Sequence, residues 1–138
     1  MLHEILKMIH MTAAAIFVLC AIIAFAMLIV TSGRDVESRR GILQKIRRFA
    51  VIPSDIALGV VWLLGIWMAI STGFWAAGWL WLKVAIVFAI SGIHGAMSKR
   101  YRLLVGGEAV NLSSAAAMLA IFVVGAIAVV GLAFSKPF

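Results

Sequence analysis

The chain has 138 residues, of which 65% are hydrophobic and 12% are charged, and its formal net charge is +7. A soluble domain is typically about half apolar and about a quarter charged, so this composition excludes an ordinary soluble domain and predicts a polytopic membrane protein. The length suits a single integral membrane domain, residues 1–138, of about four spans joined by short loops. Because the basic residues are clustered, the positive charge indicates membrane topology and anionic lipid as a partner, and not nucleic acid.

The first predicted span covers about residues 5–30. It opens on a mixed stretch that contains His3, Lys7 and His10, and it continues as an uninterrupted apolar run. That run is too long for the apolar part of a signal peptide and lacks a cleavage pattern, so we expect an uncleaved span. The one cysteine, Cys20, lies in the middle of the run and has no partner for an intrachain disulfide.

Residues 31–48 form the first basic loop, in which arginines and lysines outnumber acidic residues. The second half of this loop is amphipathic, because Ile42, Leu43, Ile46 and Phe49 recur at helical spacing. We expect a short amphipathic helix that lies at the lipid surface, with its basic side toward anionic headgroups.

The second predicted span, about 53–72, opens with Pro53, because a proline in the first turn of a helix loses no hydrogen bond. The alternative is one continuous helix that is kinked at the proline. A turn rich in tryptophan and glycine, typical of a membrane interface, precedes the third span at about 80–98. The second basic loop, 99–111, leads to the fourth span, about 112–134, whose many small residues allow helices to approach closely.

The predicted fold is therefore an all-α, four-helix membrane bundle with a short amphipathic helix before the second span. An even number of spans puts both basic loops on one side of the membrane. The positive-inside rule then places these loops in the cytoplasm and both termini outside, and we expect the plasma (inner) membrane of a bacterium.

Ionisable residues within the spans are the candidate functional residues, since lipid cannot solvate them and they usually face a bundle interior or a cofactor. At about 1.5 Å per residue, the expected helix ends place His10 and His94 about 24 Å apart in depth, too far to share one metal ion. The same estimate of depth along the helices pairs His10 with Lys83 in the outer half of the bundle and His94 with Asp55 in the inner half.

The outer pair can ligate haem iron, because imidazole is a common axial ligand and a deprotonated amine also donates a lone pair. The alternative is that Lys83 extends to the interface and His10 hydrogen-bonds a carbonyl. The inner pair can relay protons or bind haem propionates. The alternative is that Ser54 or Asp55 caps the second span and His94 lies at headgroup level.

A third possibility is copper, because thioether and imidazole ligands suit Cu(I) and Met8, His10 and Met11 lie close together with His3 nearby. The alternative is that both methionines are ordinary apolar packing residues.

Three stretches of the chain resemble the HemJ-type protoporphyrinogen IX oxidases, within a wider group that includes CopD-like membrane domains. They are LKMIHM at 6–11, Ile52-Pro53 followed by LGVVWLLGIWM at 58–68, and GWLWLKVAIVFAISGIHGAMSKR at 78–100. The resemblance covers roughly residues 3–104. The chain differs from the family pattern in the second half of the first span, which lacks a tyrosine–histidine pair, and at Ile93, where a tyrosine is usual.

The resemblance implies a helical membrane protein that binds haem b and oxidises protoporphyrinogen IX to protoporphyrin IX. It assigns the axial haem iron ligands to His10 and Lys83. Asp55, His94 and Arg100 would then serve proton transfer or bind the propionates. Haem or a porphyrin and anionic lipids are the expected partners, together with a second copy or another membrane subunit.

The alternatives are a non-enzymatic accessory or structural membrane subunit, docked through small residues of the third and fourth spans, and a CopD-like copper-handling protein.

Overall fold

The computed structural model describes residues 1–107 and 111–135 of the chain. Within these ranges every regular element is helical, in the order α1 (Leu2–Thr31), α2 (Val36–Ile46), the π-helical turn η1 (Arg47–Val51), α3 (Ile52–Thr72), the 3-10 turn η2 (Phe74–Ala76), α4 (Gly78–Val105) and α5 (Leu112–Ser135). Four helices are long and apolar enough to cross a membrane. The chain is an all-α, four-helix membrane bundle, as its composition and hydropathy predict.

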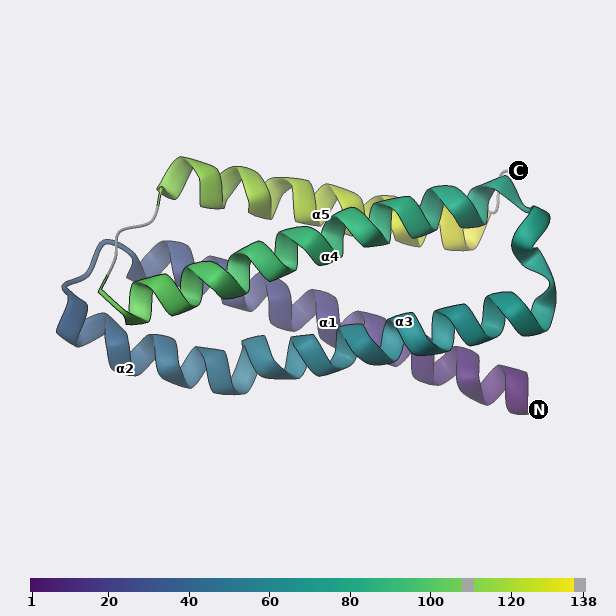
Figure 1. Cartoon of the computed structure of the whole chain (residues 1–138), viewed down its shortest axis with the longest axis horizontal. Coiled ribbons are helices and arrows are strands. Elements are labelled where there is room, and N and C mark those ends of the chain that lie inside the picture. Colours follow the sequence, from purple (N-terminus) through teal and green to yellow (C-terminus); the bar gives the residue numbers. More distant parts are fainter. Residues whose placement is uncertain (108–110, 136–138) are drawn as a thin grey trace.

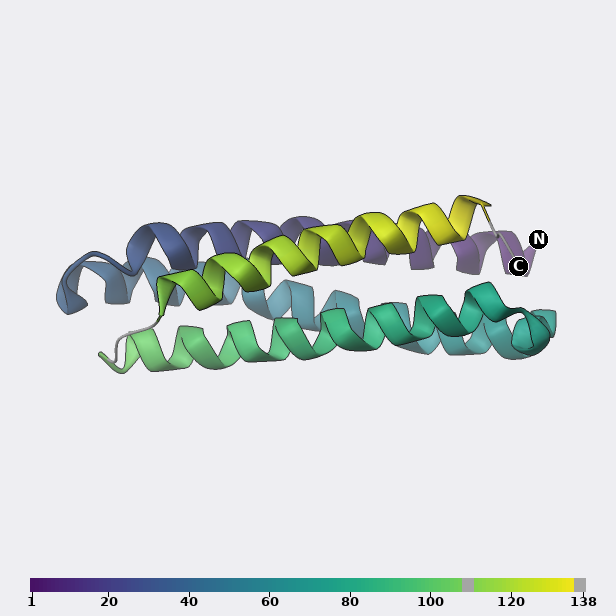
Figure 2. The ribbon, with the colours of Figure 1, turned by 90° about the horizontal axis from the view of Figure 1, so that it is seen from above.

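The four long helices run along one common axis and form an elongated bundle (Figure 1). α1 packs along α3, α4 packs along α5, and α5 also contacts α1 (Figure 2). α1 begins and α5 finishes at one end, which we call the terminal end. α1 and α4 finish at the other end, where α2 begins, and we call this the basic end.

The predicted amphipathic helix is present as α2, and it begins where Asp35 accepts a hydrogen bond from the backbone N–H of Ser38 at 3.2 Å. The hydrogen bonds from Ser38 lower the pKa of the Asp35 carboxyl. The chain does not leave the helix before Pro53, however. It runs through η1 into α3, so that Val36–Thr72 is one long helix, and the alternative of a continuous helix is correct.

The π-helical turn η1 accommodates Pro53 in this continuous helix. Proline has no backbone N–H, so the ordinary hydrogen-bond pattern cannot pass through it unchanged. Immediately before it, the N–H of Ile52 bonds to the carbonyl of Arg47, five residues back, as in a π-helix. The helix therefore continues across the proline with one widened turn.

α2 packs against the other helices of the bundle. Its apolar side is covered by protein, and not only by lipid as expected. Leu43 is fully buried and Arg39 is buried as well. The guanidinium of Arg39 donates to the carbonyl of Ser32 at 3.2 Å, and Arg40 Nε donates to the carbonyl of Val105 at 3.2 Å. These two arginines, expected to face headgroups, instead cap the ends of α1 and α4, where the helix dipole favours a cation.

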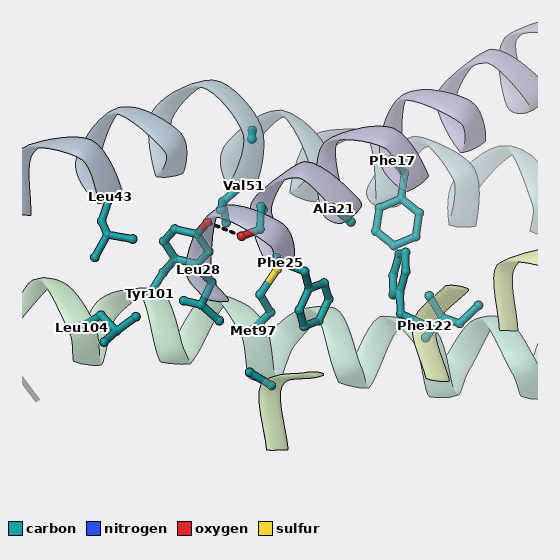
Figure 3. Packing of buried hydrophobic residues seen from close by; sticks show 14 of the residues in the cluster. Phe17, Ala21, Phe25, Leu28, Leu43, Val51, Met97, Tyr101, Leu104 and Phe122 are labelled. Carbon is teal, nitrogen blue, oxygen red and sulfur yellow. Dashed lines mark hydrogen bonds between the residues drawn. The ribbon is translucent and has the colours of Figure 1, made fainter. Parts of the chain in front are cut away.

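α4 is longer than predicted and continues through Val105, so that residues 99–105 of the expected second basic loop are helical. The extension is stabilised because Tyr101 and Leu104 are fully buried near Leu28 and Leu43 (Figure 3). The Tyr101 hydroxyl donates a hydrogen bond to the carbonyl of Ala24 on α1. Residues 108–110 of that expected loop lie outside the described residues.

The turn between α3 and α4 is short and aromatic, as expected for a membrane interface. Gly73 ends α3 with a φ of 71°, a left-handed conformation that favours glycine. The indole N–H of Trp81 then donates to the carbonyl of Trp75 at 2.7 Å, and the two rings lie 5.8 Å apart. These contacts hold the start of α4 beside the end of α3.

Candidate functional site

The structure brings His94 of α4 and Asp55 of α3 into direct contact. His94 Nε2 lies 2.6 Å from Asp55 Oδ1 and 3.3 Å from Ser54 Oγ. The His94 side chain is only 2% exposed, whereas that of Asp55 is 51% exposed. The ring of Phe17 on α1 meets the His94 ring edge-on, with centroids 5.2 Å apart. We call His94, Asp55 and Ser54 the inner cluster.

The hydrogen bonds of the inner cluster decide which imidazole nitrogen carries the proton. The single hydroxyl proton of Ser54 is donated to the carbonyl of Val51 at 2.7 Å, so the Ser54 oxygen can only accept from His94. Asp55 is an acceptor when ionised. His94 Nε2 therefore carries a proton that it donates to both oxygens. His94 Nδ1 is buried and has no hydrogen-bond partner among the described residues, so it is the atom at which a second proton can bind.

One alternative interpretation of these residues is wrong. The side chains of Ser54 and Asp55 do not cap the start of a helix, because α3 continues from η1 without a break. His94 is buried against Phe17, and α4 continues beyond it to Val105.

The outer pair consists of His10 on α1 and Lys83 on α4, and both side chains are half-buried. The charge of Lys83 lies within electrostatic range of the His10 imidazole. The ring of His10 faces α3 at Gly65, where an added Cβ would lie 3.2 Å from Cε1 and 3.8 Å from Nδ1. The glycine therefore leaves room for the imidazole. His10 Nδ1 is buried without a hydrogen-bond partner in the part of the chain that the structure describes.

The depth separation of about 24 Å between His10 and His94 is wrong. Phe17 touches His94, and it lies two helical turns along α1 from His10, a rise of about 10 Å. The error arose because α4 continues past residue 98, which places His94 farther from the basic end than expected. His10 lies nearer the terminal end and His94 nearer the basic end, as expected, but the two sites are closer together.

Arg100 does not join the inner cluster. Its Nη2 donates to Ser114 Oγ on α5 at 3.0 Å, and its Nη1 donates to the carbonyl of Ala96 at 3.4 Å. Six residues along a helix rotate a side chain by about 600°, which turns Arg100 well away from the face of His94.

A cavity of about 330 Å³ lies near Asp55, between α4 and the helix formed by η1 and α3, toward the basic end. Arg100 does not line it. Asp55 lines this cavity together with Arg47, Ser98 and Arg102. Ser98 and Arg102 follow His94 at i+4 and i+8, so helical spacing was a signal that could have identified them. Arg47 could be identified as a lining residue only from the structure, which shows that η1 continues into α3.

The side chains of the possible copper ligands differ in their surroundings. Met8 and Met11 are exposed on α1, whereas His10 faces α3. Among the described residues, no group of three or more histidine, cysteine, aspartate or glutamate side chains is arranged to hold a metal ion.

Comparisons with protein-family models, with curated proteins and with solved structures found no match to this chain.

Proposed function

We propose that the protein is a membrane redox protein that binds haem b in the outer half of the bundle, with His10 and Lys83 as the axial ligands. The observation that carries the proposal is the outer pair itself. His10 Nδ1 is a buried nitrogen with no hydrogen-bond partner among the described residues, and the amine of Lys83 lies within electrostatic range of its ring. An imidazole nitrogen is a common axial ligand of haem iron, and bundles hold such cofactors between facing helices.

Gly65 has no side chain, so the His10 ring can pack directly against α3, which would hold the imidazole in place as a ligand. A bound haem would supply one-electron redox chemistry, and the protein would supply its ligands and its surroundings. Lys83 would have to release its proton before it could ligate iron.

The inner cluster supports a second role for the protein beside haem binding, the transfer of protons. His94 Nε2–H is held by Asp55 and Ser54, which leaves Nδ1 to accept and release a proton. The Asp55 carboxylate stabilises the imidazolium when Nδ1 is protonated. Because Asp55 is half exposed and lines the cavity, it connects the buried imidazole to the basic end. Arg100 is not included in this proposed site.

The reaction we propose is the oxidation of a porphyrinogen, protoporphyrinogen IX, to protoporphyrin IX. It rests on the resemblance of residues 6–11, 52–68 and 78–100 to the HemJ-type oxidases. The oxidation removes electrons and protons from the porphyrinogen. The electrons would pass through the haem site to an acceptor in the membrane, such as a quinone, and the inner cluster is the candidate site for the protons. We further propose that the basic end is cytoplasmic, that both termini lie outside, and that the membrane is a bacterial plasma membrane.

An absorption spectrum of the purified, haem-reconstituted protein, oxidised and dithionite-reduced, tests the ligand assignment. We expect a b-type spectrum that is lost in His10→Ala and altered in Lys83→Ala. His3→Ala and Lys7→Ala are the matched controls, because both side chains are exposed on the same first helix, and they should leave the spectrum unchanged. Equal spectra for all four variants would rule out His10 and Lys83 as ligands. A wild type that binds no haem would leave a structural membrane bundle as the better interpretation.

A further inference from the structure

The cavity between the α3 side and α4 has features that neither the outer pair nor the inner cluster uses. Its volume of about 330 Å³ lies at the lower end of the range of small-molecule sites, about 300 to 1,000 Å³. Arg47 of η1 and Arg102 of α4 both line it, so an arginine borders the cavity on each of two elements. Guanidinium groups are planar donors that match the oxygens of a phosphate in pairs.

The charge balance of the cavity favours an anion. Asp55 is its one acidic lining residue among the described residues, and His94 Nε2 already donates to that carboxylate at 2.6 Å. Ser98 also lines the cavity, although its hydroxyl oxygen is itself buried and has no hydrogen-bond partner within residues 1–107 and 111–135.

Arg47 lies on the same stripe of the continuous helix as two other residues that line the cavity. Arg47 opens η1 and its carbonyl accepts the wide π-helical bond from Ile52. Arg47, Val51 and Asp55 all line the cavity, one turn apart along the continuous helix. π-Helical turns occur often at functional sites, where they redirect side chains.

We propose that this cavity binds the phosphate of an anionic phospholipid headgroup, held by Arg47 and Arg102. A lipid fits better than a free phosphate ion because the cavity continues onto an apolar surface. Ile52 lines the cavity and is itself exposed, and Ile56, one turn farther along α3, is more exposed still. These side chains provide a surface for an acyl chain beside the headgroup. The proposal does not depend on haem binding.

Native mass spectrometry of the full chain in detergent, titrated with phosphatidylglycerol, tests the charge requirement. The double variant Arg47→Gln/Arg102→Gln should bind the lipid more weakly by about tenfold or more, because it loses charge-assisted hydrogen bonds. The matched control is Arg48→Gln/Lys99→Gln, which removes the same charge from η1 and α4 at exposed residues that do not line the cavity. An equal loss of lipid affinity in both double variants would show that the lipid is attracted by surface charge in general, and it would overturn the proposal.

A second pair of variants tests the cavity without any change of charge. Gly95 lines the cavity, and a Cβ at this residue would meet no atom within 4 Å, so Gly95→Leu fills the space with little disturbance of the fold. Gly92, on the same helix, is equally open but does not line the cavity. We expect Gly95→Leu to lose the bound lipid and Gly92→Leu to retain it.

Inorganic phosphate, added as a competitor, separates the two sources of the anion. Retention of phosphatidylglycerol in millimolar phosphate is the expected result. Displacement of the lipid by phosphate at concentrations equal to that of the lipid would identify a site for the free ion and would contradict the lipid proposal, as would full lipid binding by Gly95→Leu. Circular dichroism melts confirm that each variant is folded.

Discussion

Polar side chains inside this bundle connect helices to one another. A polar group that is buried away from water costs free energy unless it is hydrogen-bonded, and the cost is high in a membrane. Trp62 of α3 donates its indole N–H to Ser91 of α4 at 3.0 Å, and His94 connects the same two helices farther along. Tyr101 connects α4 to α1. Each of these side chains thus stabilises the packing and orients its neighbours.

Removal of the Tyr101 hydroxyl should destabilise the bundle. Tyr101→Phe keeps the fully buried ring and deletes only the hydrogen bond to the carbonyl of Ala24. We expect a loss of about 1 kcal/mol in the free energy of unfolding, the usual size of an interhelical hydrogen bond in a membrane protein. Reversible unfolding in mixed micelles measures it. A variant as stable as wild type would show that the hydroxyl bond contributes nothing to the fold.

Neighbouring polar residues could be predicted from the sequence where their depth along the helices was enough to pair them. The prediction paired His94 with Asp55, which the structure brings into direct contact. It also placed His10 and Lys83 in the same half of the bundle, where the charge of Lys83 lies within electrostatic range of His10. It failed for Arg100, whose direction depends on helix rotation, and for Arg47, because the helix was not expected to continue through η1 into α3. The functions of all these residues stay predictions.

At the scale of elements, the contact between α4 and α5 depends on a small residue. A Cβ added at Gly125 would lie 3.0 Å from both Cδ1 and Cγ1 of Ile90, closer than side chains normally approach. Small residues allow this close packing of helices in membranes, as the composition of the fourth span predicts.

Gly125→Ala should therefore weaken the packing of α5 on α4. We expect it to lower the free energy of unfolding by about 1 to 3 kcal/mol, because Ile90 must shift to admit the methyl group. Gly131→Ala is the matched control on the same helix, since a Cβ there meets no atom within 4 Å. It should be neutral or slightly stabilising, because alanine favours a helix. The same unfolding measurement compares the two, and equal stabilities would contradict close packing at Gly125.

The helix that runs from Val36 to Thr72 shows which element boundaries a sequence does not reveal. Pro53 and the basic residues before it indicated a break, because proline lacks a hydrogen-bond donor. The chain instead widens one turn at η1 and continues, and the burial of Leu43 and Arg39 holds α2 against the bundle. Tertiary packing outweighed the local signal. The long apolar runs were predicted well, because a span needs little besides length and hydropathy.

At the scale of the whole molecule, the bundle has two chemically different ends. α1 begins and α5 finishes at the terminal end, whereas the arginines of α2 and η1 and the last turn of α4 lie at the basic end (Figure 1). We propose from the positive-inside rule that the basic end is cytoplasmic. This orientation would place the outer pair toward the outside and the inner cluster toward the cytoplasm.

Cysteine labelling of intact cells tests this orientation. In a background that carries Cys20→Ser, single cysteines replace Leu2 at the terminal end and Gly33 at the basic end, and both wild-type residues are exposed. A membrane-impermeant maleimide should label the residue-2 cysteine in intact cells and the residue-33 cysteine only after the membrane is opened. The reverse pattern would contradict the orientation.

The reduced-minus-oxidised absorption spectra of haem-reconstituted wild type, Gly65→Ala and Gly59→Ala test for a haem site at His10. Neither substitution removes a ligand, and both lie on α3, but only at Gly65 would the added Cβ press on His10, at 3.2 Å. We predict a b-type spectrum in wild type that is unchanged in Gly59→Ala and shifted or weakened in Gly65→Ala. A wild type without a haem spectrum, or identical spectra for all three proteins, would contradict a haem site at His10.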